Sequence, residues 1–266
     1  MICTLGDLLL DVIVRVEGRI AEDTDTYGRT RVGAGGQAAN VAAWAAALGA
    51  RARFLGKRAR DPAGRLLLEE LRGRGVEVAG PEVDTGTGTV VSLAAADGSR
   101  TMLTDRGVAR HFRPDELDPA WLDGVEWLHV PGYSLADAPI RDTALAAAGL
   151  VSRVSVDVSS TTAVEAAGVG AFRAVLAAVA PAVVFGNEAE MELVGAVAAD
   201  TLVVKRGAGG VLVRRAGGSE AHPAREVEVV DSTGAGDAFA AGFLVGGVAL
   251  GLSAAARCVS TLGAMP

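Results

Sequence analysis

The stretch from Asp231 to Leu244, DSTGAGDAFAAGFL, combines residue types that could carry out chemistry. Gly234, Ala235 and Gly236 have almost no side chain, and they lead into a sequence that is typical of a helix. A helix start of this kind exposes backbone N–H groups and the positive end of the helix dipole, which together favour a bound anion. Asp237 adds a carboxylate at the same point. The pattern therefore predicts either an ordinary turn with a helix cap or an anion site with a base beside it.

The excess of glycine favours the anion site, because a cap needs only one polar side chain. If the anion is a phosphoryl group in transfer, the Asp237 carboxylate can accept the proton of the attacking hydroxyl while N–H groups hold the developing charge. The sequence contains no GxxxxGK[ST] motif and no protein-kinase HRD or DFG motif. Residues 33–38, GAGGQA, fit a dinucleotide-binding pattern only loosely, since Arg53 stands where an acid is expected. We therefore interpret 231–244 as a phosphoryl-transfer site.

Short β-branched runs alternate with Ala- and Leu-rich stretches along the chain. The runs predict strands at 2–16, 51–56, 89–96, 126–132, 153–159, 182–187, 201–207 and 210–215, and helices at 37–48, 64–73, 139–150, 171–179 and 238–244. This alternation predicts one α/β domain, residues 1–266, in which helices cover both faces of a mostly parallel central sheet. Ligands bind such sheets at the carboxyl ends of the strands, where the glycines and acids of this chain fall.

Two regions, 12–32 and 84–108, do not follow this alternation of strands and helices. They are extended, turn-rich and charged, and Asp97-Gly98 is a hairpin signal, so they predict a small β-sheet beside the main domain. The small sheet would act as a lid over a substrate, or else be an edge extension or a subunit contact. Arg106 and Arg110 follow its second piece and would either meet a negatively charged part of the substrate or face solvent.

Composition and charge narrow the function classes. The chain is 50% hydrophobic and 21% charged, which is typical of a globular protein, and its net charge of -7 argues against a nucleic-acid-binding surface. Cys3 and Cys258 form no metal-ligand spacing and no disulfide framework, so we expect a reducing cytoplasm. The apolar N-terminus carries Asp7 and Asp11 without a basic leader, which indicates a first strand rather than a signal peptide. The uncharged stretch 238–256 is built from Ala and Gly, and predicts a buried helix followed by a turn rather than a membrane span.

Several motifs together resemble those of the ribokinase-like, or PfkB, carbohydrate kinases. DSTGAGDAFAAGFL is similar to the C-terminal signature of that family and GAGGQAANVAAWAAALGA to its N-terminal signature, while FLGKRARDPAGRLLLEELRGRGVEV, DGSRTM, VFGNEAEMELV and VVKRGAGGVLV occur in the family's order. GDLLLD is closer to the fructokinase and 2-keto-3-deoxygluconate kinase branches, because Leu9 and Gln37 stand where ribokinases proper have Asn and Lys. The family's chains usually continue past the position of Pro266, which bears on the adenine pocket and a monovalent-cation site.

The resemblance implies a fold, an activity and partners. The fold would be a ribokinase-like three-layer αβα sandwich with a small β-sheet lid. The activity would be phosphorylation of a hydroxyl of a small sugar or sugar acid by ATP with Mg²⁺, and K⁺ is a candidate second cation. The protein would be a homodimer through the lid, with no nucleic-acid or membrane partner.

The resemblance also implies roles for individual residues. The catalytic base would be Asp237, and the anion hole would be formed by Gly234, Ala235 and Gly236 with the N–H of Asp237. Sugar hydroxyls would be bound by Asp11, Gly35, Gly36 and Asn40. The nucleotide would be contacted by Asn187, Lys205, Gly207, Gly210 and Gly236. Mg²⁺ would be placed through water by Glu190, and a monovalent cation would be bound by Asp231 and Thr233. The Asn187–Glu190 spacing taken alone predicts a helix capping box.

Two alternatives stay open at this point. A nucleoside kinase on the same scaffold would need an apolar or aromatic pocket for the base, and with an aromatic content of 4% the candidates are Tyr27, Trp44, Phe112 and Tyr133. The second alternative is a sugar-binding protein that has the same fold but does not catalyse phosphoryl transfer.

Overall fold

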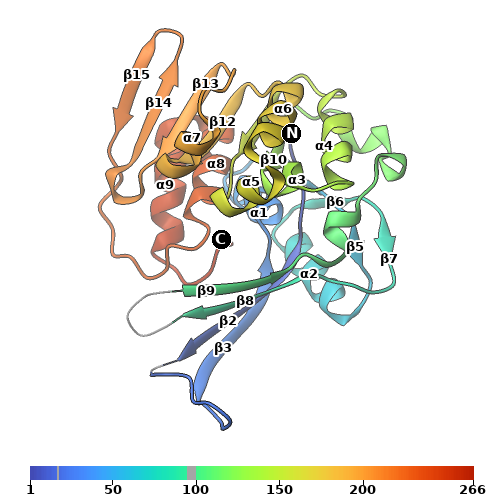
Figure 1. Cartoon of the computed structure of the whole chain (residues 1–266), viewed down its shortest axis with the longest axis vertical. Helices are drawn as coiled ribbons and strands as arrows, with labels where there is room; N and C mark the ends of the chain where they lie inside the picture. Colours follow the sequence, from blue (N-terminus) through green and yellow to red (C-terminus); the bar gives the residue numbers. More distant parts are fainter. Residues whose placement is uncertain (17, 95–99) are drawn as a thin grey trace.

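The computed structural model describes residues 1–16, 18–94 and 100–266, and arranges them as a large sheet covered by helices with a smaller sheet at one side (Figure 1). The large sheet has nine strands in the order β15-β14-β13-β12-β11-β10-β1-β4-β6. Neighbours from β13 to β6 are parallel, and β14 and β15 are antiparallel additions at one edge. The prediction of an α/β fold with a mostly parallel sheet is confirmed.

The elements have the following bounds. The large sheet contains β1 (Ile2–Leu5), β4 (Ala52–Leu55), β6 (Glu77–Ala79), β10 (Trp127–Pro131), β11 (Val154–Asp157), β12 (Val183–Asn187), β13 (Thr201–Lys205), β14 (Val211–Arg215) and β15 (Gly218–His222). The helices are α1 (Gln37–Ala47), α2 (Pro62–Gly73), α3 (Tyr133–Ala136), α4 (Ile140–Ala148), α5 (Thr161–Ala167), α6 (Val169–Val179), α7 (Glu188–Val194), α8 (Ala235–Gly246) and α9 (Val248–Val259). A short separate pair is formed by β5 (Arg58–Ala59) and β7 (Glu82–Val83).

Helices cover the large sheet on both faces. On one face α1 and α8 pack together over β1 and β4, and α9 packs on α8. On the other face α4, α6 and α7 pack over β10, β11 and β12. Residues 38–45 of α1 are all buried, and their mostly alanine side chains let α1 lie close to both the sheet and α8. The third layer that the alternating pattern predicted is therefore present.

The chain leaves the large sheet earlier than predicted. The apolar run 2–16 is not one strand, because β1 ends at Leu5 and the next strand, β2 (Leu9–Val16), belongs to the small sheet. The turn begins at Gly6, where an added Cβ would lie 2.9 Å from both Ala38 Cβ and Ser134 Oγ. Uninterrupted hydrophobicity hides this change of sheet, since both segments are at least partly buried. Asp11 therefore lies in the small sheet and not at the end of the first strand.

The small sheet has four strands in the order β3-β2-β8-β9, with β3 (Gly28–Gly35), β8 (Thr89–Ala94) and β9 (Arg100–Asp105). Strand β2 is antiparallel to β3 and parallel to β8, and β8 is antiparallel to β9. These strands come largely from the two regions, 12–32 and 84–108, that do not follow the alternation of strands and helices. The predicted turn at Asp97-Gly98 lies outside the described residues, and the action of this sheet as a lid stays a prediction.

The predicted helices are present with ends shifted by a few residues, while α3, α5 and α9 were not predicted and α7 was predicted only through the capping box at its start. The uncharged stretch 238–256 forms most of α8 and α9, which are separated at Gly247, where φ is 81°. Among the described residues, no single helix is both long and apolar enough to cross a membrane, although α5 and α6, bent by 100° at their junction, meet that test as a pair by length and composition.

Candidate active site

Three neighbouring strands of the large sheet end in polar side chains at one edge. Asp157 is the last residue of β11, Asn187 of β12 and Lys205 of β13. Because parallel strands end at the same edge of a sheet, these side chains are brought together. Nζ of Lys205 donates to Oδ2 of Asp157 at 2.5 Å, and the Asp157 side chain is fully buried. Asp157 was missed at the sequence level, although an acid that ends a buried parallel strand is a usable signal.

The loop before α8 leaves N–H groups of the first helical turn without helical partners. Gly234 has a φ of 77°, and a Cβ there would lie 2.6 Å from Cα of Ala264, so only glycine fits. The first bond within the helix runs from N of Ala238 to O of Gly234 at 2.9 Å, and no side chain of the described residues caps the helix. The N–H groups of Gly236 and Asp237 are therefore available to an anion.

A cation lies against this helix start. A Cβ built on Gly236 would lie 3.1 Å from Nζ of Lys205, so the ammonium group touches the first turn of α8. Burial alone would lower the pKa of Lys205, but the Asp157 carboxylate outweighs that effect and raises the pKa. The ammonium group is therefore charged, and it adds to the positive end of the helix dipole.

Asp237 is held at this point by a residue from the other end of the sequence. Nδ2 of Asn40, which is buried on α1, donates to Oδ2 of Asp237 at 2.8 Å. Burial raises the pKa of Asp237 to about 7, with the Asn40 hydrogen bond opposing the rise and the Asp157 carboxylate adding to it. A carboxyl group with a pKa near neutral is partly ionised and is also able to keep a proton that it accepts.

Asp11 and Asn40, the predicted sugar ligands, are positioned by one glycine loop. A Cβ on Gly35 would lie 2.1 Å from the Asp11 carboxylate, so the missing side chain makes room for that acid. Gly36 has a φ of 96°, and a Cβ there would lie 2.6 Å from O of Asp7. Burial, followed by the nearby Asp7 carboxylate, raises the pKa of Asp11 to about 6. Since Gly36 directly precedes α1, the same loop sets the position of Asn40.

Asp7 was not predicted as a site residue, but it lies buried between β1 and the small sheet. Its carboxylate accepts a hydrogen bond from the Arg106 guanidinium, whose Cζ lies 3.7 Å from the ring centroid of Tyr133. The alternative in which Arg106 faces solvent is wrong, because only 22% of its side chain is exposed. Arg110 stays at the surface and pairs with Asp137 at 3.3 Å.

Asn187 and Glu190 form the capping box that their spacing predicts, at the start of α7. N of Glu190 donates to Oδ1 of Asn187 at 2.9 Å, and N of Asn187 donates to Oε2 of Glu190 at 2.8 Å. Burial raises the pKa of Glu190, and the Asp157 carboxylate adds to that rise. Among the described residues, no group of three or more His, Cys, Asp or Glu side chains is arranged to hold a metal ion. The role of Glu190 toward Mg²⁺ stays a prediction.

The loop after Lys205 is rich in glycine and lies beside the same edge of the sheet. Gly207 is exposed and has a φ of 56°. Gly210 has a φ of 80°, and a Cβ there would lie 2.0 Å from O of His222, so this position requires glycine. The loop leaves an exposed backbone directly after β13, and its contact with a nucleotide stays a prediction.

Asp231, predicted as a cation ligand, is buried and bound to backbone donors. Its Oδ1 accepts from N of Thr233 at 2.8 Å, and its Oδ2 accepts from N of Gly263 at 3.1 Å. These bonds tie the loop before α8 to the segment 262–264.

The segment 262–264 is also bound to two other parts of the molecule. Nε1 of Trp44, on α1, donates to O of Ala264 at 2.8 Å. A guanidinium nitrogen of Arg31, on β3, donates to O of Leu262 at 2.5 Å. One short segment therefore contacts the loop before α8, a core helix and the small sheet.

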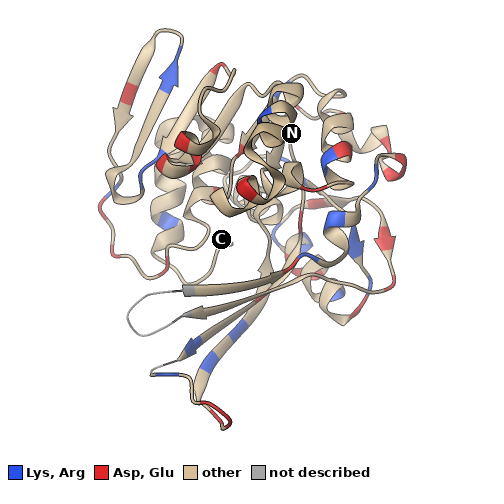
Figure 2. Ribbon diagram, in the orientation of Figure 1, with Lys and Arg blue, Asp and Glu red and all other residues tan. Residues whose placement is uncertain are grey.

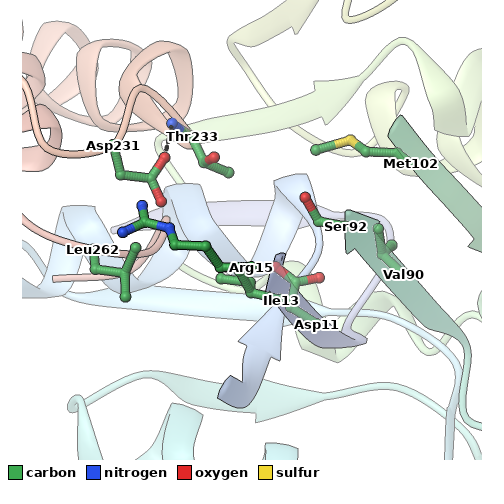
Figure 3. Close-up of a pocket in the computed structure, with 9 residues that line it drawn as sticks. All are labelled: Asp11, Ile13, Arg15, Val90, Ser92, Met102, Asp231, Thr233 and Leu262. Atoms are coloured by element: carbon green, nitrogen blue, oxygen red, sulfur yellow. Dashed lines mark hydrogen bonds between the residues drawn. The ribbon is translucent and has the colours of Figure 1, made fainter. Parts of the chain in front are cut away.

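A pocket lies between the small sheet and the loop before α8 (Figure 3). It encloses about 440 Å³, including space open to solvent. Its walls are formed by Asp11, Ile13, Arg15, Val90, Ser92 and Met102 of the small sheet and by Asp231, Thr233 and Leu262 opposite them. Asp11, a predicted sugar ligand, and Thr233, the residue before Gly234, thus line the same pocket.

Comparisons with known proteins agree with this geometry. Residues 1–265 match the model of the pfkB family carbohydrate kinases. The chain is 32% identical over 255 residues to an ATP-dependent ribose-1-phosphate kinase from Halopiger xanaduensis, covering 91% of this chain and 83% of that protein. It is 30% identical over 274 residues to a fructokinase from Klebsiella pneumoniae, covering 94% and 85% respectively, which agrees with the predicted branch.

A solved structure shares the whole fold. An uncharacterised sugar kinase from Pyrococcus horikoshii in complex with ATP matches with a TM-score of 0.87 and 23% identity, over 100% of this chain and 95% of that chain. This likeness confirms the ribokinase-like fold. The family match over nearly every residue, two relatives at 30% identity or more and the hydrogen bond that joins the two signatures through Asn40 and Asp237 lead to one conclusion: this chain belongs to the PfkB family of carbohydrate kinases.

Proposed function

We propose that this protein transfers the γ-phosphoryl group of ATP to a hydroxyl group of a small sugar or sugar acid, with Asp237 as the catalytic base. The observation that carries the proposal is the environment of Asp237. Its carboxyl group has a pKa of about 7, and it stands beside free N–H groups of α8 and the ammonium group of Lys205. Family membership and the names of the relatives, a ribose-1-phosphate kinase and a fructokinase, support the reaction class.

In the proposed step, the substrate hydroxyl gives its proton to Asp237 as its oxygen attacks the γ-phosphorus. The bond between that phosphorus and the oxygen bridging it to the β-phosphate breaks, and ADP leaves with the electron pair. The N–H groups of Gly236 and Asp237 and the Lys205 ammonium group stabilise the charge on the transferred group. Asn40 keeps the carboxylate aimed at the hydroxyl through its Nδ2 bond.

Two buried polar atoms without hydrogen-bond partners support sugar binding at this point. Oδ1 of Asn40 and Oδ1 of Asp7 are buried and have no hydrogen-bond partner among the described residues. Buried polar atoms in native proteins nearly always have a hydrogen-bond partner. Both of these oxygens can accept a hydrogen bond from a sugar hydroxyl group. We propose that sugar hydroxyls bind these atoms and the Asp11 carboxylate, as the glycine loop at Gly35 and Gly36 allows.

Cations belong to the same proposal. Since the described residues contain no protein cage for a metal, the residues present fit a Mg²⁺ ion held mainly by the phosphates of ATP and by water, with Glu190 beside it. When bound, Mg²⁺ would neutralise charge on the phosphates. The Asp231 carboxylate already accepts hydrogen bonds from two backbone N–H groups, so a K⁺ ion held by Asp231 and Thr233 would be an additional partner of that carboxylate. Measuring kcat in the presence of K⁺ and of a large organic cation tests this.

The small sheet is proposed to close over the pocket and to form a homodimer contact. Closure would exclude water from the phosphoryl group. On the face opposite Asp11, strand register aligns Val12, Val32, Val91 and Leu103 in one row across the four strands. Val32 is 50% exposed and Leu103 is 58% exposed, and a second copy of the chain would cover them. Sedimentation of the wild type and of a Leu103→Glu variant tests this contact.

The two alternatives are less well supported. Of the aromatic candidates for a nucleoside base, Trp44 and Phe112 are buried in the core, Tyr27 is 93% exposed and Tyr133 is covered by Arg106. A sugar-binding protein without turnover would not need a base with a near-neutral pKa. The proposed compartment is the cytoplasm, since both cysteines are buried thiols without a disulfide.

Replacement of the base tests the proposal. Asp237→Asn should lower kcat by about 10²- to 10⁴-fold, because the proton acceptor is lost, while sugar binding largely survives. Asp200→Asn removes an exposed carboxylate elsewhere and should leave kcat unchanged. ADP release across ketoses, aldoses, keto-deoxy acids and nucleosides measures both effects, and near-normal turnover by Asp237→Asn would sink the assignment.

A further inference from the structure

The face of the small sheet that lines the pocket carries three arginines. Asp11, Ile13 and Arg15 alternate along β2 and all line the pocket. Arg29 of β3 stands directly opposite Arg15, and Arg31 stands directly opposite Ile13. Directly opposed residues of an antiparallel pair project from the same face. Arg29 and Arg31 therefore share the face of Arg15, and the blue bands on β2 and β3 in Figure 2 mark this positive stripe.

This stripe contrasts with the rest of the protein. The chain has a net charge of -7, yet the only acid on the described parts of β2 and β3 is Asp11. Like charges directly opposite each other destabilise a strand pair, and the Arg15–Arg29 pair has that arrangement. Among the described residues, neither Arg15 nor Arg29 has a hydrogen-bond or ion-pair partner, whereas Arg31 is occupied by O of Leu262. A negatively charged ligand between Arg15 and Arg29 would remove the repulsion.

The position of the stripe fits the far end of a small substrate. Arg15 lies four positions after Asp11, which is about 13 Å along the strand, and the long arginine side chain can bridge much of that length. Figure 3 shows the Arg15 side chain extending across the pocket on the side of Asp231. A ligand whose hydroxyls meet Asp11 would therefore have its opposite end within reach of the guanidinium groups.

From this arrangement we infer that the substrate carries a negatively charged group, a phosphate monoester or a carboxylate, that binds Arg15 and Arg29 away from the reacting hydroxyl. The inference rests on the proposed kinase function and narrows its substrate class. The planar guanidinium fork matches both phosphate and carboxylate oxygens. The competing explanation is that Arg15 only balances the charge of Asp231, in which case its loss would affect every substrate equally.

Matched substrates separate these explanations. ADP release is measured with ribose and ribose 1-phosphate, with fructose and fructose 6-phosphate, and with 2-keto-3-deoxygluconate and its methyl ester. The variants are Arg15→Gln and Arg29→Gln. Arg214→Gln is the control, because Arg214 is also an exposed arginine on a strand without a partner among the described residues, but it lies on β14 of the large sheet, next to the edge strand β15.

We expect the wild type to prefer the charged member of at least one pair by about tenfold or more in kcat/KM. Arg15→Gln and Arg29→Gln should each raise KM for that substrate by about tenfold or more and change KM for its neutral partner less than about twofold. The preferred pair identifies phosphate or carboxylate. Equal use of charged and neutral members, or equal effects of the variants on both, overturns the inference and leaves the kinase proposal standing.

Binding measured without turnover keeps the two proposals apart. Calorimetric titration of Asp237→Asn with the charged and neutral sugars should show the same preference, and Arg15→Gln added to that variant should abolish it. If no acceptor supports ADP release by the wild type but this preference is present, the kinase proposal fails while the anionic subsite stands. If titration shows no preference, the subsite is refuted whatever the turnover.

Discussion

Replacing Asn40 with alanine should move the pH dependence of turnover upward. Its amide donates the 2.8 Å hydrogen bond that stabilises the ionised form of Asp237, whose pKa is about 7 with that bond in place. A hydrogen bond to a charged group contributes about 1.5–3 kcal/mol, and about 1.4 kcal/mol corresponds to one pKa unit. The pKa of Asp237 should therefore rise by about 1–2 units, and the ionised fraction at pH 7 should fall by about 5- to 50-fold.

The assay is kcat/KM measured from pH 5.5 to 9.5, which reports the pKa of the free enzyme. In the wild type the acid limb should have its midpoint near pH 7, well above the ordinary range of an aspartate. In Asn40→Ala the midpoint should lie about 1–2 units higher and activity should recover in alkali, even though lost sugar contacts lower the whole profile. Asn187→Ala removes an amide that does not contact Asp237, so its midpoint should not move. An unchanged or lowered midpoint in Asn40→Ala refutes the assignment of Asp237 as a base tuned by this bond.

Two further substitutions test the positive site and the glycine loop. Lys205→Met leaves the Asp157 carboxylate buried without its cation, and should therefore lower the free energy of unfolding, measured in urea, by about 3 kcal/mol. A double variant that also carries Asp157→Asn should regain most of the stability but not kcat. Recovery of kcat in the double variant would show that Lys205 has only a structural role. Gly36→Ala should cost at least about 2 kcal/mol of stability, because φ is 96° and the new Cβ would lie 2.6 Å from O of Asp7. Gly73→Ala, at the end of α2 with no atom within 4 Å of the new Cβ, is its control and should be neutral or stabilising in the same urea experiment.

Local chemistry made part of this site predictable. Glycines before a helix with an acid in its first turn predicted a helix start with exposed N–H groups, and the structure places Gly234 at a positive φ before an α8 that no side chain of the described residues caps. The alternation of β-branched runs with alanine-rich stretches predicted the layers, because each element repeats the hydrophobic period of its own geometry. The Asn187–Glu190 capping box is a local motif too, and its spacing was sufficient to predict it.

The remaining features depend on contacts between distant segments. The bond between Asn40 and Asp237 joins residues 197 positions apart, and the bond between Asp157 and Lys205 joins residues 48 apart, so neither spacing carries a local signal. The division of 2–16 into strands of two sheets was missed because both segments are hydrophobic. The role of Arg106 could not be predicted either, because its partner Asp7 lies 99 positions away in the sequence.

The segment 262–264 connects the small sheet to the proposed phosphoryl site. Arg31 on β3 holds Leu262, the next residue holds Asp231, and Ala264 packs against Gly234 at the start of α8. If the small sheet moves as proposed and keeps the Arg31 bond, Leu262 moves with it and pulls on the backbone that would form the proposed anion hole. Pocket closure and alignment of the N–H groups would then be one displacement, so that a phosphoryl group meets a fully formed cradle only when the pocket is shut.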